Sequence, residues 1–151
     1  MAPKTLKLFA VLSLSLAFAG PAVSTGLAQP SAALTVIVRG LRNDQGQVLG
    51  ALYDGAGTWL DHDHVADRCR ATISHGVARC TFRHAAPGAV AVAAMHDENL
   101  DGELGRDLVG IPQEGYAFSN DVRPSLGPPS FESATLPPAT RSTTVHAHYG
   151  I

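Results

Sequence analysis

Short runs of alternating apolar and polar residues, separated by turn-forming residues, dominate the chain after about residue 30. Residues 34–39, LTVIVR, are one such run. A period of two places alternate side chains on opposite faces of a strand, and no long stretch shows the 3.6-residue period of a helix. Glycine and proline punctuate the runs throughout. The pattern predicts an all-β fold: a Greek-key β-sandwich of immunoglobulin or transthyretin-like type, with about seven strands.

Two hairpins are expected in the first half of the domain. Residues 34–39 and 48–53 flank a polar turn, Asn-Asp-Gln-Gly, and are expected to pair with each other. Residues 68–73 and 77–83 are expected to pair around Ser-His-Gly. Between the hairpins, the irregular stretch 55–67 is expected to hold at most a short helical turn.

The second half contains one strong strand signal and several weaker ones. Residues 89–96, AVAVAAMH, are apolar at almost every position, which predicts a central strand buried on both faces. Residues 143–149 are expected to close the sandwich. Weak strands are expected at 108–109 and 134–136.

The first 28 residues have the organisation of a secretory signal peptide. Lys4 and Lys7 precede the apolar run 8–19, which is shorter than the roughly 20 residues of a membrane span. Small residues two apart then favour cleavage after Ala28. The alternative is a buried N-terminal helix. We therefore expect one soluble domain, residues 29–151, in the periplasm or the external medium.

The charge balance argues against polyanionic partners. Both lysines lie in the leader, so nine arginines remain against 13 acidic residues. Affinity for phosphate backbones and anionic lipid surfaces depends on clustered cations. We expect no nucleic-acid partner and no membrane insertion once the leader is removed.

The two cysteines flank the second expected hairpin. If Ala71 lies opposite Ala78, then Cys69 lies opposite Cys80, at a separation suited to a disulfide, and both cysteines point inward on the apolar face of the hairpin. An oxidising compartment favours that bond. The alternative is a pair of buried free thiols.

An acidic turn follows the expected central strand. Oxygen-bearing side chains occupy the first, third and fifth positions of 97–102, and Gly102 is the sixth, as in the start of a calcium loop. The acid that an EF-hand needs at its twelfth position is replaced by Leu108, so this is not an EF-hand. The alternative is an ordinary turn built from Asp, Asn and Gly. The candidate calcium ligands are Asp97, Asn99, Asp101, Glu103 and Asp107.

Several motifs together resemble those of a bacterial secreted family catalogued as domain of unknown function 2141. They are HDEN with DGEL at 96–104, GIPQEGYAFSN at 110–120, GPPSF at 127–131 and GLRN at 40–43. The resemblance implies a small exported β-sandwich with no established activity. One departure is Ala89, because the family usually has an aromatic residue after the Pro-Gly pair.

The stretch 110–131 is long for a connection in a compact domain, and such loops are often functional. Its aromatic side chains are expected to anchor it, while Glu114, Asn120 and Asp121 are expected to approach the acidic turn. The alternative is that the aromatics only pin a crossover and the acids face solvent. The predicted binding-loop residues are His96, Glu114, Tyr116, Phe118, Asn120 and Phe131.

Histidines offer a weaker signal. His146 and His148 are two apart and share a strand face, and His62 and His64 form a second cluster that could join them in binding zinc or copper. A chance pair of exposed histidines is the alternative.

No catalytic residue is assigned, since the sequence has no phosphate loop, dinucleotide fingerprint or Gly-x-Ser-x-Gly elbow. The leading hypothesis is an exported, non-catalytic module that binds a ligand or partner, with calcium as the one candidate cofactor. The alternatives are a structural domain without metal, or a small hydrolase that uses acids near Asp97 and Glu114.

Overall fold

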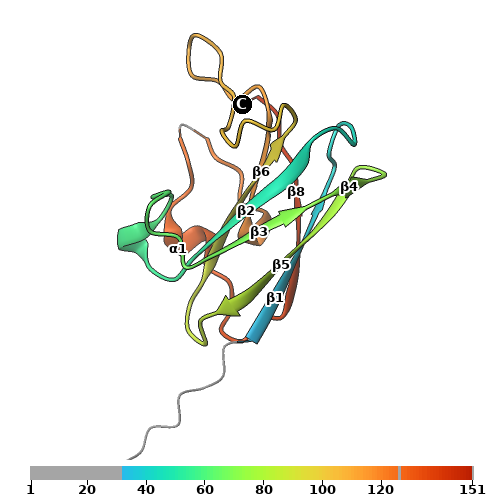
Figure 1. Ribbon diagram of the computed structural model, residues 1–151. Coiled ribbons are helices and arrows are strands. Elements are labelled where there is room, and N and C mark those ends of the chain that lie inside the picture. The colour runs from blue at the N-terminus through green and yellow to red at the C-terminus, as the bar shows by residue number, and fades with distance from the viewer. Residues whose placement is uncertain (1–31, 126, 151) are drawn as a thin grey trace, which may run out of the picture.

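The computed structural model describes residues 32–125 and 127–150, and these form two four-stranded sheets packed face to face (Figure 1). Sheet A has the strand order β4-β5-β1-β8, and sheet B has the order β3-β2-β6-β7. The all-β prediction is confirmed, with eight strands in place of about seven. The predicted signal peptide, residues 1–28, lies outside the described residues.

The strands are short, and little helix accompanies them. The strands are β1 (Ala32–Arg39), β2 (Gln47–Tyr53), β3 (Asp67–Ala71), β4 (Ile73–Ser74), β5 (Val77–Ala85), β6 (Ala91–Asp97), β7 (Gly115–Phe118) and β8 (Ser142–His146). The helical elements are η1 (Ala56–Thr58), η2 (Ser119–Asp121) and α1 (Phe131–Ala134). None of the helices in the described residues is long and apolar enough to cross a membrane.

The hydrophobic core lies between the sheets and follows the period of two. In β1, Leu34, Val36 and Val38 are buried, and the residues between them are more exposed. The predicted central strand is confirmed. Val92 of β6 packs in this core, while Ala91 belongs to a second cluster with Tyr53 of β2 and two residues of α1.

The expected pairing of the first two strands is wrong. β1 pairs with β5 antiparallel and with β8 in parallel, whereas β2 pairs with β3 and β6. The connection between β1 and β2 crosses from one sheet to the other. Alternation specifies which face of each strand is buried. Two strands can bury their apolar faces either as neighbours in one sheet or from opposite sheets across the core, so alternation does not specify which strands pair.

The second expected hairpin is only partly correct. Residues 68–73 do not form one strand, because the chain leaves sheet B at Thr72 and continues in sheet A as β4. Ile73, and not Ala71, lies opposite Ala78. Ala71 instead pairs with Val48.

The weaker strand predictions fail in three places. Leu108 and Val109 lie in an exposed turn. The segment 134–136 spans the end of α1, and only Leu136 makes a β-bridge, to Val90. The closing strand ends at His146. The short helical turn expected in 55–67 is present as η1.

The Cys69–Cys80 disulfide is confirmed, and it joins the two sheets. Cys69 lies on β3 opposite Gly50, Cys80 lies on β5 opposite Val36, and their Cα atoms are 5.5 Å apart. The predicted register across a hairpin was therefore wrong, although the inward orientation of both side chains was right. Gly50 leaves room for the bridge, since a Cβ there would lie 2.5 Å from the Cys69 sulfur.

Candidate functional site

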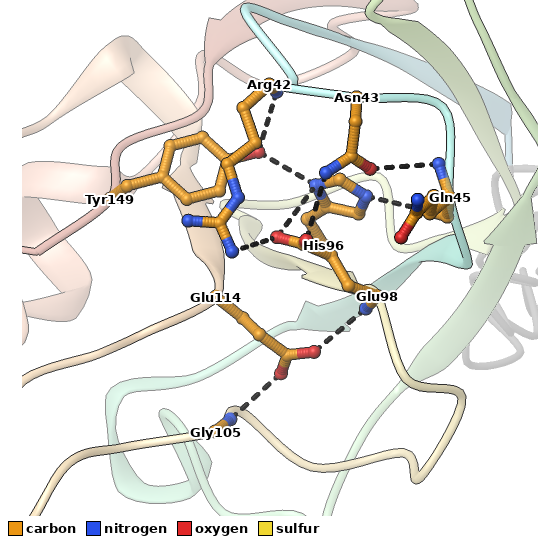
Figure 2. A network of polar contacts seen from close by, with 8 residues as sticks. All are labelled: Arg42, Asn43, Gln45, His96, Glu98, Gly105, Glu114 and Tyr149. Atoms are coloured by element: carbon orange, nitrogen blue, oxygen red, sulfur yellow. Dashed lines mark hydrogen bonds and ion pairs between the residues drawn. The ribbon is translucent and has the colours of Figure 1, made fainter.

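A partly buried polar network holds together the loops at one end of the sandwich, where β6 ends (Figure 2). At its centre is His96, which is 1% exposed. Its Nδ1 is 2.7 Å from the Tyr149 hydroxyl, and its Nε2 is 2.8 Å from the Gln45 carbonyl oxygen. Both ring nitrogens therefore have partners. His96, predicted to belong to a binding loop, is a buried link between the segment after β1 and the C-terminal segment.

Glu98 forms the charged part of the network. Its carboxylate lies 2.8 Å from an Arg42 guanidinium nitrogen and accepts a hydrogen bond of 3.0 Å from the Asn43 amide. Burial acts to raise the pKa of Glu98, but the hydrogen bonds from Asn43 and Arg42 outweigh it and hold the pKa below its usual value. The Arg42 guanidinium also stacks 4.7 Å from the centre of the Tyr149 ring. Burial raises the pKa of Tyr149.

Glu114 fixes both ends of the loop that follows β6. It is 7% exposed, and its two oxygens accept backbone hydrogen bonds from Glu98 at 2.8 Å and Gly105 at 2.9 Å. Figure 2 shows the carboxylate between these two amides. A carboxylate whose two oxygens are already engaged by the backbone is suited to holding a loop in place.

Beyond the network, segment 104–112 projects as a small hairpin at the same end of the molecule as the C-terminal segment (Figure 1). Arg106 and Pro112 form a β-bridge, and Asp107 accepts hydrogen bonds from the Val109 and Ile111 amides. At its tip, Leu108 is fully exposed and Val109 is 79% exposed. Large apolar side chains in such positions contribute nothing to the core.

An apolar cleft of about 330 Å³ lies between this hairpin and the segment around Pro124 and Pro128. The rings of Tyr116 and Phe118, on β7, line it together with Ile111. The Tyr116 hydroxyl donates a hydrogen bond to the Gly150 carbonyl at 2.9 Å. The Phe118 ring also packs against Trp59, with 6.0 Å between the ring centres, and this contact supports the aromatic side of the cleft.

A family model described as "Uncharacterized protein conserved in bacteria (DUF2141)" matches residues 36–146. The chain belongs to this family. No curated protein and no solved structure matches the chain. The resemblance predicted from the sequence is confirmed. The matched range includes Arg42, His96, Glu98 and Glu114, whereas Tyr149 lies just outside it.

The predicted binding-loop residues separate into two groups in this DUF2141 chain. Tyr116 and Phe118 line the cleft. Asn120 and Phe131 lie elsewhere: the Asn120 amide donates to the Thr135 carbonyl at 2.7 Å, and Phe131 packs 5.9 Å from Trp59. The stretch 110–131 is therefore not one long loop, because β7 and η2 lie within it, and Asn120 and Phe131 anchor the part that follows β7.

The predicted calcium ligands are not gathered around one point. Asn99 and Asp101 hydrogen-bond each other at 2.7 Å, while Asp107 is committed to its own turn. Asp97 is fully buried, with one oxygen 2.7 Å from the Gln47 amide, and its other oxygen has no partner among the described residues. Glu103 lies in the same turn, and its backbone amide donates to Asp101. Calcium binding stays a prediction, and these contacts give it no further support.

The histidines do not form a joint site. His146 lies 3.0 Å from Asp121, and His64 lies 2.8 Å from Asp61. Burial lowers the pKa of His148. Across residues 32–125 and 127–150, no three His, Cys, Asp or Glu side chains lie close enough to hold a metal ion.

Several network members were not among the predicted site residues, namely Arg42, Asn43, Gln45, Glu98 and Tyr149. Arg42 lies in the family motif GLRN, and Tyr149 follows an alternating strand pattern. Neither pattern predicts that these residues meet, because the Arg42 amide and the Tyr149 hydroxyl that accepts its hydrogen bond are 107 residues apart in the sequence.

Proposed function

We propose that this chain is an exported, non-catalytic β-sandwich module that binds a ligand or partner bearing an apolar group in the cleft beside Tyr116 and Phe118. The observation that carries the proposal is the apolar cleft with exposed Val109 on its rim. Ligand sites are typically concave, mostly apolar and about 300–1,000 Å³ in volume. Binding residues also tend to lie on loops that a rigid scaffold positions.

The polar network supports this proposal by positioning the rim. Glu114 holds the backbone on both sides of the acidic turn, and Tyr149 ties that region to the C-terminal segment. A rim that is fixed before binding loses less conformational entropy when a ligand arrives. The network's role in this proposal is therefore preorganisation, and the acids near Asp97 and Glu114 take no part in chemistry.

Replacement of a rim side chain tests the cleft. N-phenyl-1-naphthylamine, a neutral fluorescent apolar probe, is expected to bind saturably, and Val109→Ser is expected to weaken it about fivefold or more, since apolar contact area is lost. The fluorescence of Trp59, the only tryptophan in the chain, gives a second readout, because its ring lies 6.0 Å from Phe118.

Leu100→Ser is the matched control, because Leu100 is also exposed, at 63%, but does not line the cleft. Both variants should unfold at the wild-type temperature, since neither side chain is in the core. Equal weakening by the two substitutions, or no saturable binding by wild type, would contradict the proposed site.

Export is the second part of the proposal. The disulfide supports it, because such bonds persist in oxidising compartments. When the full chain is expressed in a bacterial host, the periplasmic or external fraction is expected to contain protein whose intact mass corresponds to a chain that starts at Gln29. A full-length mass recovered from the cytoplasm alone would contradict export.

We further propose the transthyretin-like form of the Greek-key sandwich. In immunoglobulin constant domains the first two strands share a sheet. Here β1 and β2 lie in different sheets, which favours the transthyretin-like alternative.

A further inference from the structure

A second cavity, of about 670 Å³, lies where the chain crosses between the sheets at Thr72. Unlike the cleft, it is lined mainly by polar side chains, and the two share no lining residue. Among the residues that the structure describes, the lining of this cavity includes three arginines and two hydroxyl-bearing residues but no carboxylate. These five residues are Arg39, Arg70, Arg79, Thr72 and Ser74.

The fold brings the three arginines together from three strands. Arg79 on β5 lies next to Ile37 of β1, so Arg39, two residues further along β1, projects from the same outer face. Arg70 comes from β3 in the other sheet, where it pairs with Leu49. The crossover at Thr72 joins these two surfaces. No local sequence pattern relates the three positions.

The three arginine side chains have no ion-pair partner among the residues that the structure describes. Arg39, Arg70 and Arg79 are exposed, and in the described part of the chain none of them forms an ion pair or a side-chain hydrogen bond. Arg42, by contrast, is paired with Glu98. Asp44, which binds the His75 and Gly76 amides, is engaged at the neighbouring turn. Like charges around one hollow repel each other, and a bound anion would relieve that repulsion.

Guanidinium groups suit a particular class of anion. Each presents a planar fork of donors that matches the two oxygens of a carboxylate or phosphate, and arginine is more weakly hydrated than lysine. The Thr72 and Ser74 hydroxyls can donate further hydrogen bonds. The volume lies within the range of sites for small organic ligands.

We propose that this cavity binds a small molecule that carries two or more carboxylate or phosphate groups. This inference goes beyond the proposed function, because it concerns another surface and a ligand of opposite character. An apolar partner at the cleft and an anion here can bind to the same molecule.

Calorimetric titration of the full chain at low ionic strength tests the site, with citrate and inorganic pyrophosphate as probes. Saturable binding of either probe is expected, and the stronger one identifies carboxylate or phosphate as the preferred group. Arg70→Gln and Arg79→Gln are each expected to weaken binding about tenfold, through the loss of a charge-assisted hydrogen bond. Added salt is expected to weaken it further.

Arg83→Gln is the matched control. Arg83 is exposed and lies on β5 with Arg79, but it does not line the cavity, so this substitution removes the same charge outside the proposed site. Its affinity should stay within about twofold of wild type, as expected for a remote charge screened by salt. The proposal is overturned if wild type binds neither probe saturably, or if Arg83→Gln weakens binding as much as Arg70→Gln. Unchanged thermal unfolding of all three variants confirms that a loss of binding is local.

Discussion

A Cys69→Ala/Cys80→Ala variant is expected to lose about 3 kcal/mol of its free energy of unfolding. The disulfide closes a loop between residues 11 apart in the sequence and links β3 in one sheet to β5 in the other. In the chain-entropy account, a cross-link of this length restricts the unfolded chain and so stabilises the folded one. Total stabilities of small domains are only about 5–15 kcal/mol, so the loss is large.

Urea denaturation with and without a reducing agent measures the effect. Reduction should lower the wild-type midpoint towards that of the variant, and it should leave the variant unchanged. The denaturant dependence should also steepen once the cross-link is gone, because the unfolded chain exposes more surface. A wild-type midpoint that does not respond to full reduction would contradict the prediction.

Gly46→Ala is expected to destabilise the protein by about 3 kcal/mol, through backbone strain and steric overlap combined. Gly46 has a φ of +69°, and a Cβ there would collide with the backbone of Asp97 and lie 2.7 Å from the Glu98 Cα. The obstruction is main chain, so no side-chain rotation relieves it. The substitution would also displace Gln45, whose carbonyl binds His96.

Gly102→Ala separates the two contributions. Gly102 has a φ of +81°, but nothing lies within 4 Å of the position its Cβ would take. It should therefore cost only about 1 kcal/mol, from the left-handed conformation alone. Urea denaturation of the two variants gives the difference. If the two substitutions lowered the free energy of unfolding equally, the close packing of Gly46 against the end of β6 would not explain the loss in Gly46→Ala.

Most of the strands could be predicted from the sequence, with the exception of β7, whereas their partners could not. The alternation in 34–39 identifies the buried face of β1, and the continuous apolar run in β6 identifies a central strand. Pairing depends on which neighbour lies beside each strand, and many arrangements bury the same faces. The disulfide illustrates this limit. The inward orientation of Cys69 and Cys80 follows from alternation, but the bridge spans the core and not a hairpin.

The candidate site was predictable in part for a similar reason. The family motif drew attention to His96 and Glu114, and the structure places both at one end of the sandwich. Their partners could not be foreseen, because Tyr149 reaches His96 from a distant segment and Glu114 binds backbone amides, which any residue provides. The arginines around Thr72 come from three strands, so only the pairing of those strands brings them together.

The parallel pairing of β1 with β8 has a consequence for how the molecule is assembled. Thr35 lies beside Ser142 and Arg39 beside His146, so the first and last strands of the domain are neighbours in sheet A. Contacts between residues so far apart in sequence are slow to form, because a large chain loop must close first. Until β8 arrives, β1 remains an open sheet edge, which is a surface that other strands can join. The sandwich can therefore close only after β8, residues 142–146, has been made.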